Sequence, residues 1–430
     1  MTHIRRLVGR RAVVRALFVA SVLILLPVHA AFSEPGIEEG YDEIVRRTEE
    51  IRGLEFKTKL PLDRMGKEEL DSFLAKELNR QYSPEQWKSM QASLALLGAI
   101  PKDLQLETFF RHLLGEQVGG FYDQHTKQMV VVGDLSLKVA ISRIILEHEL
   151  THALTDQHFD LLSLPIEDIE NDDRAVAALA VAEGDATLSM LEYAVSDMDI
   201  GSAFTTLVTS AFMDDATFAA SPPLIQAWML FPYLGGQTFF LELSQRTEVV
   251  DGRLVPRKNP LSLTDVADWE VVNYAYRRPP ASTEEILHPE KYIKGSDPPL
   301  EIDFEPGVLE PLGPGWKNTW ENTFGEFFIK TLFTDILPSH AARKAAAGWG
   351  GDRYLLAEND EGGKVLYWRS LWDSSGDADE FRKACEQVAE KERFGGPAVA
   401  LPAREGHPEQ VDVWIAFEEA HLQVFQSRED

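Results

Sequence analysis

Two histidines four residues apart, with a glutamate directly after the first, are the side chains in this sequence best suited to chemistry: His148-Glu149-Leu150-Thr151-His152. Residues four apart lie on one face of a helix, so the two imidazoles would stand side by side. Imidazole nitrogen is a good zinc ligand, and the neighbouring carboxylate can take a proton from a water. We therefore expect His148 and His152 to bind a zinc ion and Glu149 to act as a general base.

A helix over residues 141–156 is needed to position this motif. The bare pattern also arises in helices by chance, so its surroundings matter. Here the surroundings are apolar, and ionisable side chains are costly to bury without a role. The apolar residues of this helix are Ile141, Ile144, Ile145, Leu146, Leu150 and Leu154.

Residues 148–156 resemble the active-site helix of the thermolysin-like zinc peptidases, the gluzincins. The resemblance implies a zincin-like fold, zinc as cofactor and a peptide or protein substrate. It also implies a third metal ligand, a glutamate on a second helix. Glu183, in a long apolar helix predicted over residues 174–196, is the best match, and Glu170 is the alternative. Gly184 lacks a side chain, so we expect the helix of residues 141–156, the metal helix, to approach closely there.

The chain departs from that family at one position that orients a histidine. Four residues after the ligand glutamate the family has an aspartate, whereas this chain has Thr187. We expect Asp156 or Asp185 to accept the hydrogen bond of a histidine ring instead.

The family also needs a hydrogen-bond donor to the oxyanion that forms during hydrolysis, usually a tyrosine or histidine from a later segment. Three side chains in this sequence are candidates for that catalytic role, and the sequence does not choose among them: Tyr233, Tyr276 and His288.

The rest of the chain resembles a group of secreted bacterial proteins of the metallopeptidase type. This wider resemblance rests on five short sequence segments: Gly120-Phe-Tyr-Asp123, Asp156-Gln-His-Phe-Asp160, Glu183-Gly-Asp-Ala-Thr187, Pro280-Ala-Ser-Thr-Glu-Glu-Ile-Leu-His-Pro289 and Gly348-Trp-Gly-Gly-Asp-Arg-Tyr354.

Charge and cysteine content limit the partners and the covalent structure. The formal net charge is −28, which argues against a nucleic-acid partner because phosphates require a basic face. The single cysteine, Cys385, excludes a disulfide within the chain.

Residues 1–33 have the features of a signal peptide: arginines, an apolar stretch over 16–28, and a small-residue cleavage site ending at Ala30 or Ser33. The sequence therefore predicts export to the periplasm or the extracellular space. Stable membrane association is expected only if the leader stays uncleaved.

The predicted fold class is α+β, with a predominantly helical, zincin-like catalytic domain, a small edge sheet and a smaller C-terminal α+β unit. Strands are predicted over 119–123 and 128–132, beside the helix that carries the motif. They could pair with a substrate backbone or form a plain hairpin of the core. A further hairpin is predicted from strands over 411–417 and 421–425. The expected segments are a signal peptide (1–33), an N-terminal helical segment (34–118), a catalytic domain (119–297), a linker (298–315) and a C-terminal domain (316–430).

These features together predict an exported zinc-dependent metallopeptidase. Two alternatives remain: a protein that keeps this fold for binding or assembly without turnover, and a zinc amidase that acts on cell-wall peptides. The presence of Glu149 favours an enzyme, because a carboxylate at that position is dispensable for holding a metal.

Overall fold

The computed structural model describes residues 38–422 apart from 134–136, 138–139, 198–215, 263–264, 296 and 402–405. The leader predicted over residues 1–33 lies outside the described residues. The described chain mixes helices with small sheets, which confirms the α+β class. Within the described ranges, no helix is both long and apolar enough to cross a membrane.

Residues 38–118 form a helical layer that is built into the rest of the molecule. Helix α2 packs against the two helices that carry the metal motif, and a short strand from this layer joins the sheet that follows. Capping fixes the start of α4: Ser83 accepts from the backbone N–H of Gln86, whose side chain accepts from Ser83 in return. The elements are α2 (Glu38–Arg52), β1 (Leu62–Met65), α3 (Lys67–Gln81), α4 (Pro84–Leu96) and α5 (Leu106–Gln117).

A three-stranded sheet with the order β1-β3-β2 lies beside the metal motif. Strands β2 (Gly120–Asp123) and β3 (Gln128–Val132) form the antiparallel pair that the sequence predicts, and β1 pairs with β3 in parallel. Strand β2 is therefore an edge strand. Just before β1, Thr58 exchanges two hydrogen bonds with Gln157, near the end of the helix that carries the motif.

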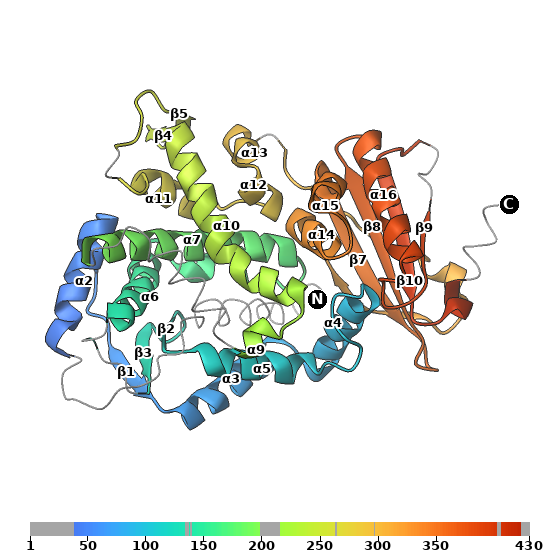
Figure 1. The fold of residues 1–430 in the computed structure, drawn as a ribbon, viewed down its shortest axis with the longest axis horizontal. Coiled ribbons are helices and arrows are strands. Elements are labelled where there is room, and N and C mark those ends of the chain that lie inside the picture. The colour runs from blue at the N-terminus through green and yellow to red at the C-terminus, as the bar shows by residue number, and fades with distance from the viewer. Residues whose placement is uncertain are drawn as a thin grey trace, which may run out of the picture.

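Two long buried helices lie at the centre, with a third crossing them. Helix α6 (Ala140–Phe159) carries the motif, and α7 (Asp172–Asp197) packs along it. Helix α10 (Pro223–Arg246) lies across α7 (Figure 1). Smaller elements complete this part of the chain: α9 (Ala216–Ala219), β4 (Thr247–Val250), β5 (Arg253–Pro256), α11 (Trp269–Arg277), α12 (Thr283–Leu287) and α13 (Pro289–Lys294).

The C-terminal unit is a five-stranded antiparallel sheet, of order β6-β7-β8-β10-β9, covered on one face by helices (Figure 1, orange to red). Its elements are β6 (Lys317–Asn322), α14 (Gly325–Thr334), α15 (Ser339–Ala346), β7 (Trp349–Glu358), β8 (Lys364–Trp372), α16 (Ser375–Glu390), β9 (Ala398–Leu401) and β10 (Gln410–Ala416).

Strand β10 pairs with β8 on one side and β9 on the other, so it has no free edge for the strand predicted over 421–425. Residues 419–422 form a 3₁₀ turn, and residues 423–425 lie outside the described residues. In the segment 298–315, which the sequence predicts as a linker, Phe304, Val308 and Leu312 pack on the sheet face that the helices leave open.

Candidate metal centre

His148 and His152 lie one turn apart on α6 and turn the same ring nitrogen toward Glu183 of α7. The Nε2 atoms of the two histidines are 3.1 Å apart, and Glu183 Oε2 lies 3.2 Å from His148 Nε2 and 3.6 Å from His152 Nε2. All three side chains are at most 1% exposed. The structure thus brings together the three predicted ligands.

The spacing of these atoms suits one small cation. Tetrahedral zinc with bonds of about 2.0–2.2 Å places its ligand atoms roughly 3.3–3.6 Å apart, close to the three separations found here. Among the described residues, His148, His152 and Glu183 are the one group of three or more potential ligands whose atoms converge within 4.8 Å. Two imidazole nitrogens and one carboxylate oxygen form a donor set that zinc accepts, with a position left for water.

The protonation of this cluster favours cation binding. Burial lowers the pKa of His148, which keeps its imidazole neutral and able to coordinate a metal. Burial alone would raise the pKa of Glu183, but the two imidazoles outweigh it and lower that pKa to about 2. The cluster therefore offers a neutral imidazole at His148 and an ionised carboxylate at Glu183.

Glu149 lies beside this cluster and is held by the edge strand. Its Oε2 accepts a hydrogen bond of 3.0 Å from the backbone N–H of Tyr122 on β2, while Oε1 is buried without a hydrogen-bond partner. Burial raises the pKa of Glu149 well above its ordinary value; the nearby charge of Glu183 adds to this, and the Tyr122 N–H opposes it. A buried carboxyl with a raised pKa is suited to taking a proton and giving it back.

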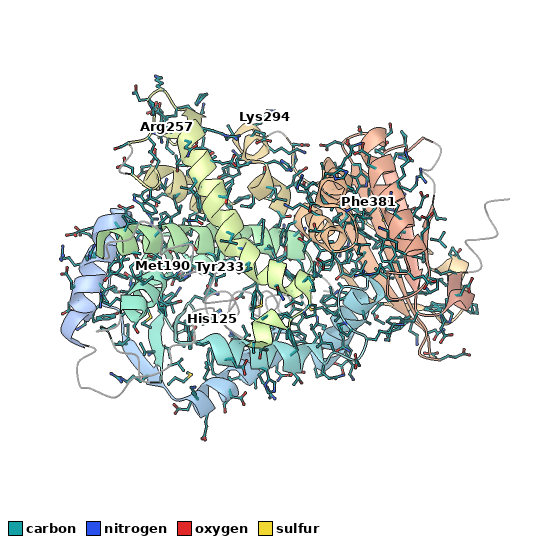
Figure 2. All side chains as sticks on the ribbon, viewed as in Figure 1. His125, Met190, Tyr233, Arg257, Lys294 and Phe381 are labelled. Atoms are coloured by element: carbon teal, nitrogen blue, oxygen red, sulfur yellow. The ribbon has the colours of Figure 1, made fainter. Side chains whose placement is uncertain are left out.

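Tyr233 is the predicted oxyanion donor that lies at the cluster. Its ring stacks on His148 at a centroid distance of 6.0 Å, and Figure 2 labels it where α10 crosses α7. Burial raises its pKa well above the usual range, and the charges of Glu183 and Glu149 add to the rise. The phenol therefore stays protonated and can donate.

The other two candidate donors are engaged elsewhere. The hydroxyl of Tyr276 donates to Asp185 at 2.8 Å, on the side of α7 that faces α11. His288 Nε2 lies 2.9 Å from Glu326 of α14, at the junction with the C-terminal unit. The alternative ligand Glu170 is exposed, and its backbone carbonyl accepts from Arg353.

The two expected histidine acceptors have other hydrogen-bond partners in the structure. Asp156 accepts from the Tyr122 hydroxyl at 2.6 Å and from Lys127 at 2.6 Å. Asp185 is paired with Arg52 of α2, Nε to Oδ1 at 2.8 Å, and both side chains are fully buried. Both carboxylates thus brace α6 and α7 against neighbouring elements.

Sequence reasoning missed Arg52, Tyr122 and Glu147. Arg52 ends a charged amphipathic helix, and nothing in the local pattern separates it from the surface arginines before it. Glu147 is fully buried, accepts from Ser189 at 2.5 Å and from Thr151, and has its pKa raised by burial to about 8. Its position directly before the motif, on an apolar helix, is the one signal that could have shown its burial.

Comparison with known proteins finds similarity for the C-terminal unit. Residues 312–424 match the model of a domain of unknown function, DUF8575. The match leaves out α6, α7 and α10 and covers none of the cluster. The chain matches no curated protein and no solved structure.

Proposed function

We propose that this protein is a zinc-dependent metallopeptidase of the gluzincin type. The observation that carries the proposal is the buried cluster of His148, His152 and Glu183 with Glu149 beside it. A site that only stored a metal would not require a second buried carboxyl held by the neighbouring strand.

In this proposal His148, His152 and Glu183 hold the ion. Bound zinc would supply a Lewis acid that lowers the pKa of a water from near 16 toward ~7. Glu149 takes the proton of the attacking water on Oε1 and passes it to the leaving nitrogen of the peptide bond. Tyr233 donates its hydroxyl proton in a hydrogen bond to the carbonyl oxygen as negative charge develops there.

The substrate backbone would lie along β2. The outer edge of this strand faces Glu149, as the hydrogen bond from the Tyr122 N–H indicates. An extended peptide added to that edge would bring its carbonyl groups past the general base. We further propose that the protein acts outside the cytoplasm after removal of the leader near Ala30 or Ser33; an N-terminus at Met1 in protein from the native host would contradict this.

The first prediction separates metal binding from catalysis. Glu149→Gln should keep zinc near one equivalent per chain and lower peptide hydrolysis by ~10²–10⁴-fold, because it removes the base and keeps the shape. His148→Ala should lose zinc and activity together. Elemental analysis and turnover of an unfolded protein substrate, measured on the same samples, check both outcomes.

Glu147→Gln is the matched control, because Glu147 is a buried glutamate on the same helix whose carboxyl contacts Ser189 and Thr151. It should retain zinc and turnover. The mechanism is wrong if Glu149→Gln remains fully active. Iron or manganese in place of zinc, or a zinc-loaded protein that cleaves no peptide, would contradict the proposed function.

A further inference from the structure

Tyr122 contacts the metal helix at two separate points. Its backbone N–H donates to Glu149 Oε2 at 3.0 Å, and its hydroxyl donates to Asp156 Oδ2 at 2.6 Å. Glu149 and Asp156 are seven residues apart, which is two turns or about 10 Å along α6. One residue of the edge strand thus spans the part of the helix that carries the motif.

The Asp156 end of this span is firmly anchored. Asp156 is 4% exposed and lies in the last turn of α6. Its Oδ1 accepts from the backbone N–H of Leu161 at 2.9 Å, and its Oδ2 also accepts from Lys127 Nζ at 2.6 Å. Tyr122 and Lys127 both belong to the β2–β3 hairpin, so the hairpin reaches this carboxylate twice.

The other end of the span decides which oxygen of Glu149 can react. A carboxylate has two equivalent oxygens until something distinguishes them. Here the Tyr122 N–H occupies Oε2 and leaves Oε1 without a hydrogen-bond partner. A shift of β2 away from α6 would free both oxygens and let the side chain change rotamer.

We propose that Tyr122 is a positioning residue: its hydroxyl, bound to Asp156, holds β2 against α6 so that its own N–H keeps Glu149 in one orientation. The effect on catalysis rests on the proposed function. The structural part of the proposal, which we call the brace, is the Tyr122–Asp156 bond that holds β2 against α6. The brace does not depend on the proposed function, because it concerns only the packing of β2 on α6. Tyr122 touches Glu149 through its backbone and acts through that residue.

The test removes one oxygen atom, with Tyr122→Phe in the full-length protein. Amide hydrogen exchange over residues 119–123 should accelerate about fivefold or more, as expected when a buried hydrogen bond that restrains the strand is lost. Zinc content should stay at the unmodified level. Turnover number should fall about 10- to 100-fold with little change in KM, the range typical when a group that orients a site residue is removed.

Two controls separate the brace from a general loss of stability. Tyr292→Phe removes an equally buried hydroxyl that donates to the carbonyl of Arg278 at 2.7 Å, far from the cluster. Lys127→Met removes the other hairpin contact with Asp156 and keeps the tyrosine bond. Neither change should alter exchange over 119–123 or turnover by more than about twofold.

The exchange and turnover measurements together decide between the brace and the alternatives. Faster exchange over 119–123 in Tyr122→Phe, but not in the two controls, supports the brace. Unchanged exchange together with unchanged turnover overturns it. If the unmodified protein holds zinc but cleaves no peptide, the proposed function fails, and the exchange comparison still decides whether Tyr122 holds the strand. If exchange accelerates while an active enzyme keeps its full turnover, Tyr122 is structural and the positioning role is rejected.

Discussion

Tyr233 shows how a single side chain can be chosen once the packing is known. Three candidate donors were open in the sequence, and they lie on or beside three different helices. Tyr276 donates to Asp185 and His288 pairs with Glu326, whereas the ring of Tyr233 stacks on His148. Its raised pKa keeps the hydroxyl proton in place at neutral pH.

Tyr233→Phe should therefore lower turnover by about 10²–10³-fold, the loss found when one oxyanion donor is removed. Zinc content and KM should change little, because the phenol stabilises charge that develops only during the reaction. Tyr276→Phe is the comparison, and it should affect stability more than turnover. Steady-state kinetics with metal analysis check the pair; a large loss in Tyr276→Phe alone would assign the donor to Tyr276.

Residue spacing explains why part of the cluster could be foreseen. The helical repeat alone puts His148 and His152 on one face, so their meeting needs no tertiary information. The prediction of Glu183 as the third ligand depended on the family resemblance and on the apolar helix around it. The acceptor roles expected of Asp156 and Asp185 involve partners from β2 and α2, which are distant in sequence, and no local pattern predicts those contacts.

At the scale of elements, the crossing of α7 and α10 holds Glu183, the proposed metal ligand, in place. A Cβ on Gly184 would lie 2.4 Å from the carbonyl carbon of Gly236, and one on Gly236 would lie 2.0 Å from the carbonyl oxygen of Ala180. The two backbones are therefore in direct contact. The sequence predicts that Gly184 lets α6 approach α7 closely. The helix that approaches Gly184 is instead α10.

Gly184→Ala should force these helices apart and displace two neighbours, Glu183 on α7 and Tyr233 on α10. We expect a loss of about 1–3 kcal/mol in the free energy of unfolding, as for other overpacked positions. Zinc affinity should fall by about tenfold or more, because positions that support metal ligands have effects of that size. Chemical denaturation and zinc titration with a competing chelator measure the two effects.

Gly115→Ala is the control for the change of residue type. Gly115 lies inside α5, where a Cβ would meet only Leu74 Cδ1 at 3.8 Å. Alanine should be neutral there or stabilise by up to about 1 kcal/mol, with zinc binding unchanged. Equal behaviour of the two variants would show that the α7–α10 contact does not support the metal site.

The sequence predicts individual helices and strands better than it predicts which of them lie next to one another. Two short apolar runs on either side of the polar turn 124–127 predicted the β2–β3 pair, because a hairpin is a local structure. Pairing of β1 with β3 and of β8 with β10 joins residues far apart in the chain, so the sequence pattern could not assign it.

At the scale of the whole molecule, the expected segments share one core. A single cluster of buried side chains runs from Leu70 and Trp87 in the N-terminal helices through α7 and α10 to Phe381 in the C-terminal unit. The backbone N–H of Gly395 donates to the carbonyl of Leu96 at 2.8 Å. The N-terminal layer thus packs on α6 and α7 and also on the C-terminal sheet.

Two motifs left without a role by the sequence meet at this junction. Asp352, from Gly348-Trp-Gly-Gly-Asp-Arg-Tyr354, accepts from the backbone of Phe324 and Gly325 and from Trp349 and Trp368. Thr283, from the segment that starts α12, donates to Asp173 at the beginning of α7. Thr283 also accepts from the backbone N–H of Phe327 in α14 at 3.1 Å, so it connects the C-terminal unit to the helix that carries Glu183.

The junction also buries acids, which makes the stability of the whole molecule depend on pH. Burial raises the pKa of Asp172 from 3.8 to about 7; the charge of Asp168 adds to the rise, and a bond with Asn322 opposes it. Burial likewise raises the pKa of Asp173 and of Asp352. A carboxyl whose pKa is higher in the folded state binds its proton more tightly there, so folding is favoured at low pH and loses that contribution as pH rises.

For Asp172 the contribution should be complete below about pH 4 and lost by about pH 7, the span between its unfolded and folded pKa values. Asp172→Asn carries a neutral side chain at every pH, so it should flatten the decline in unfolding free energy between pH 5 and 8 by ~1–2 kcal/mol. Urea denaturation at several pH values measures this. Asp360→Asn is the control: Asp360 is exposed beside Lys317, its pKa is lowered, and its removal should leave the decline unchanged. Parallel profiles for Asp172→Asn and the unmodified protein would mean that Asp172 is ionised in the folded state, and that the junction tolerates a half-buried charge at the start of the helix that carries Glu183.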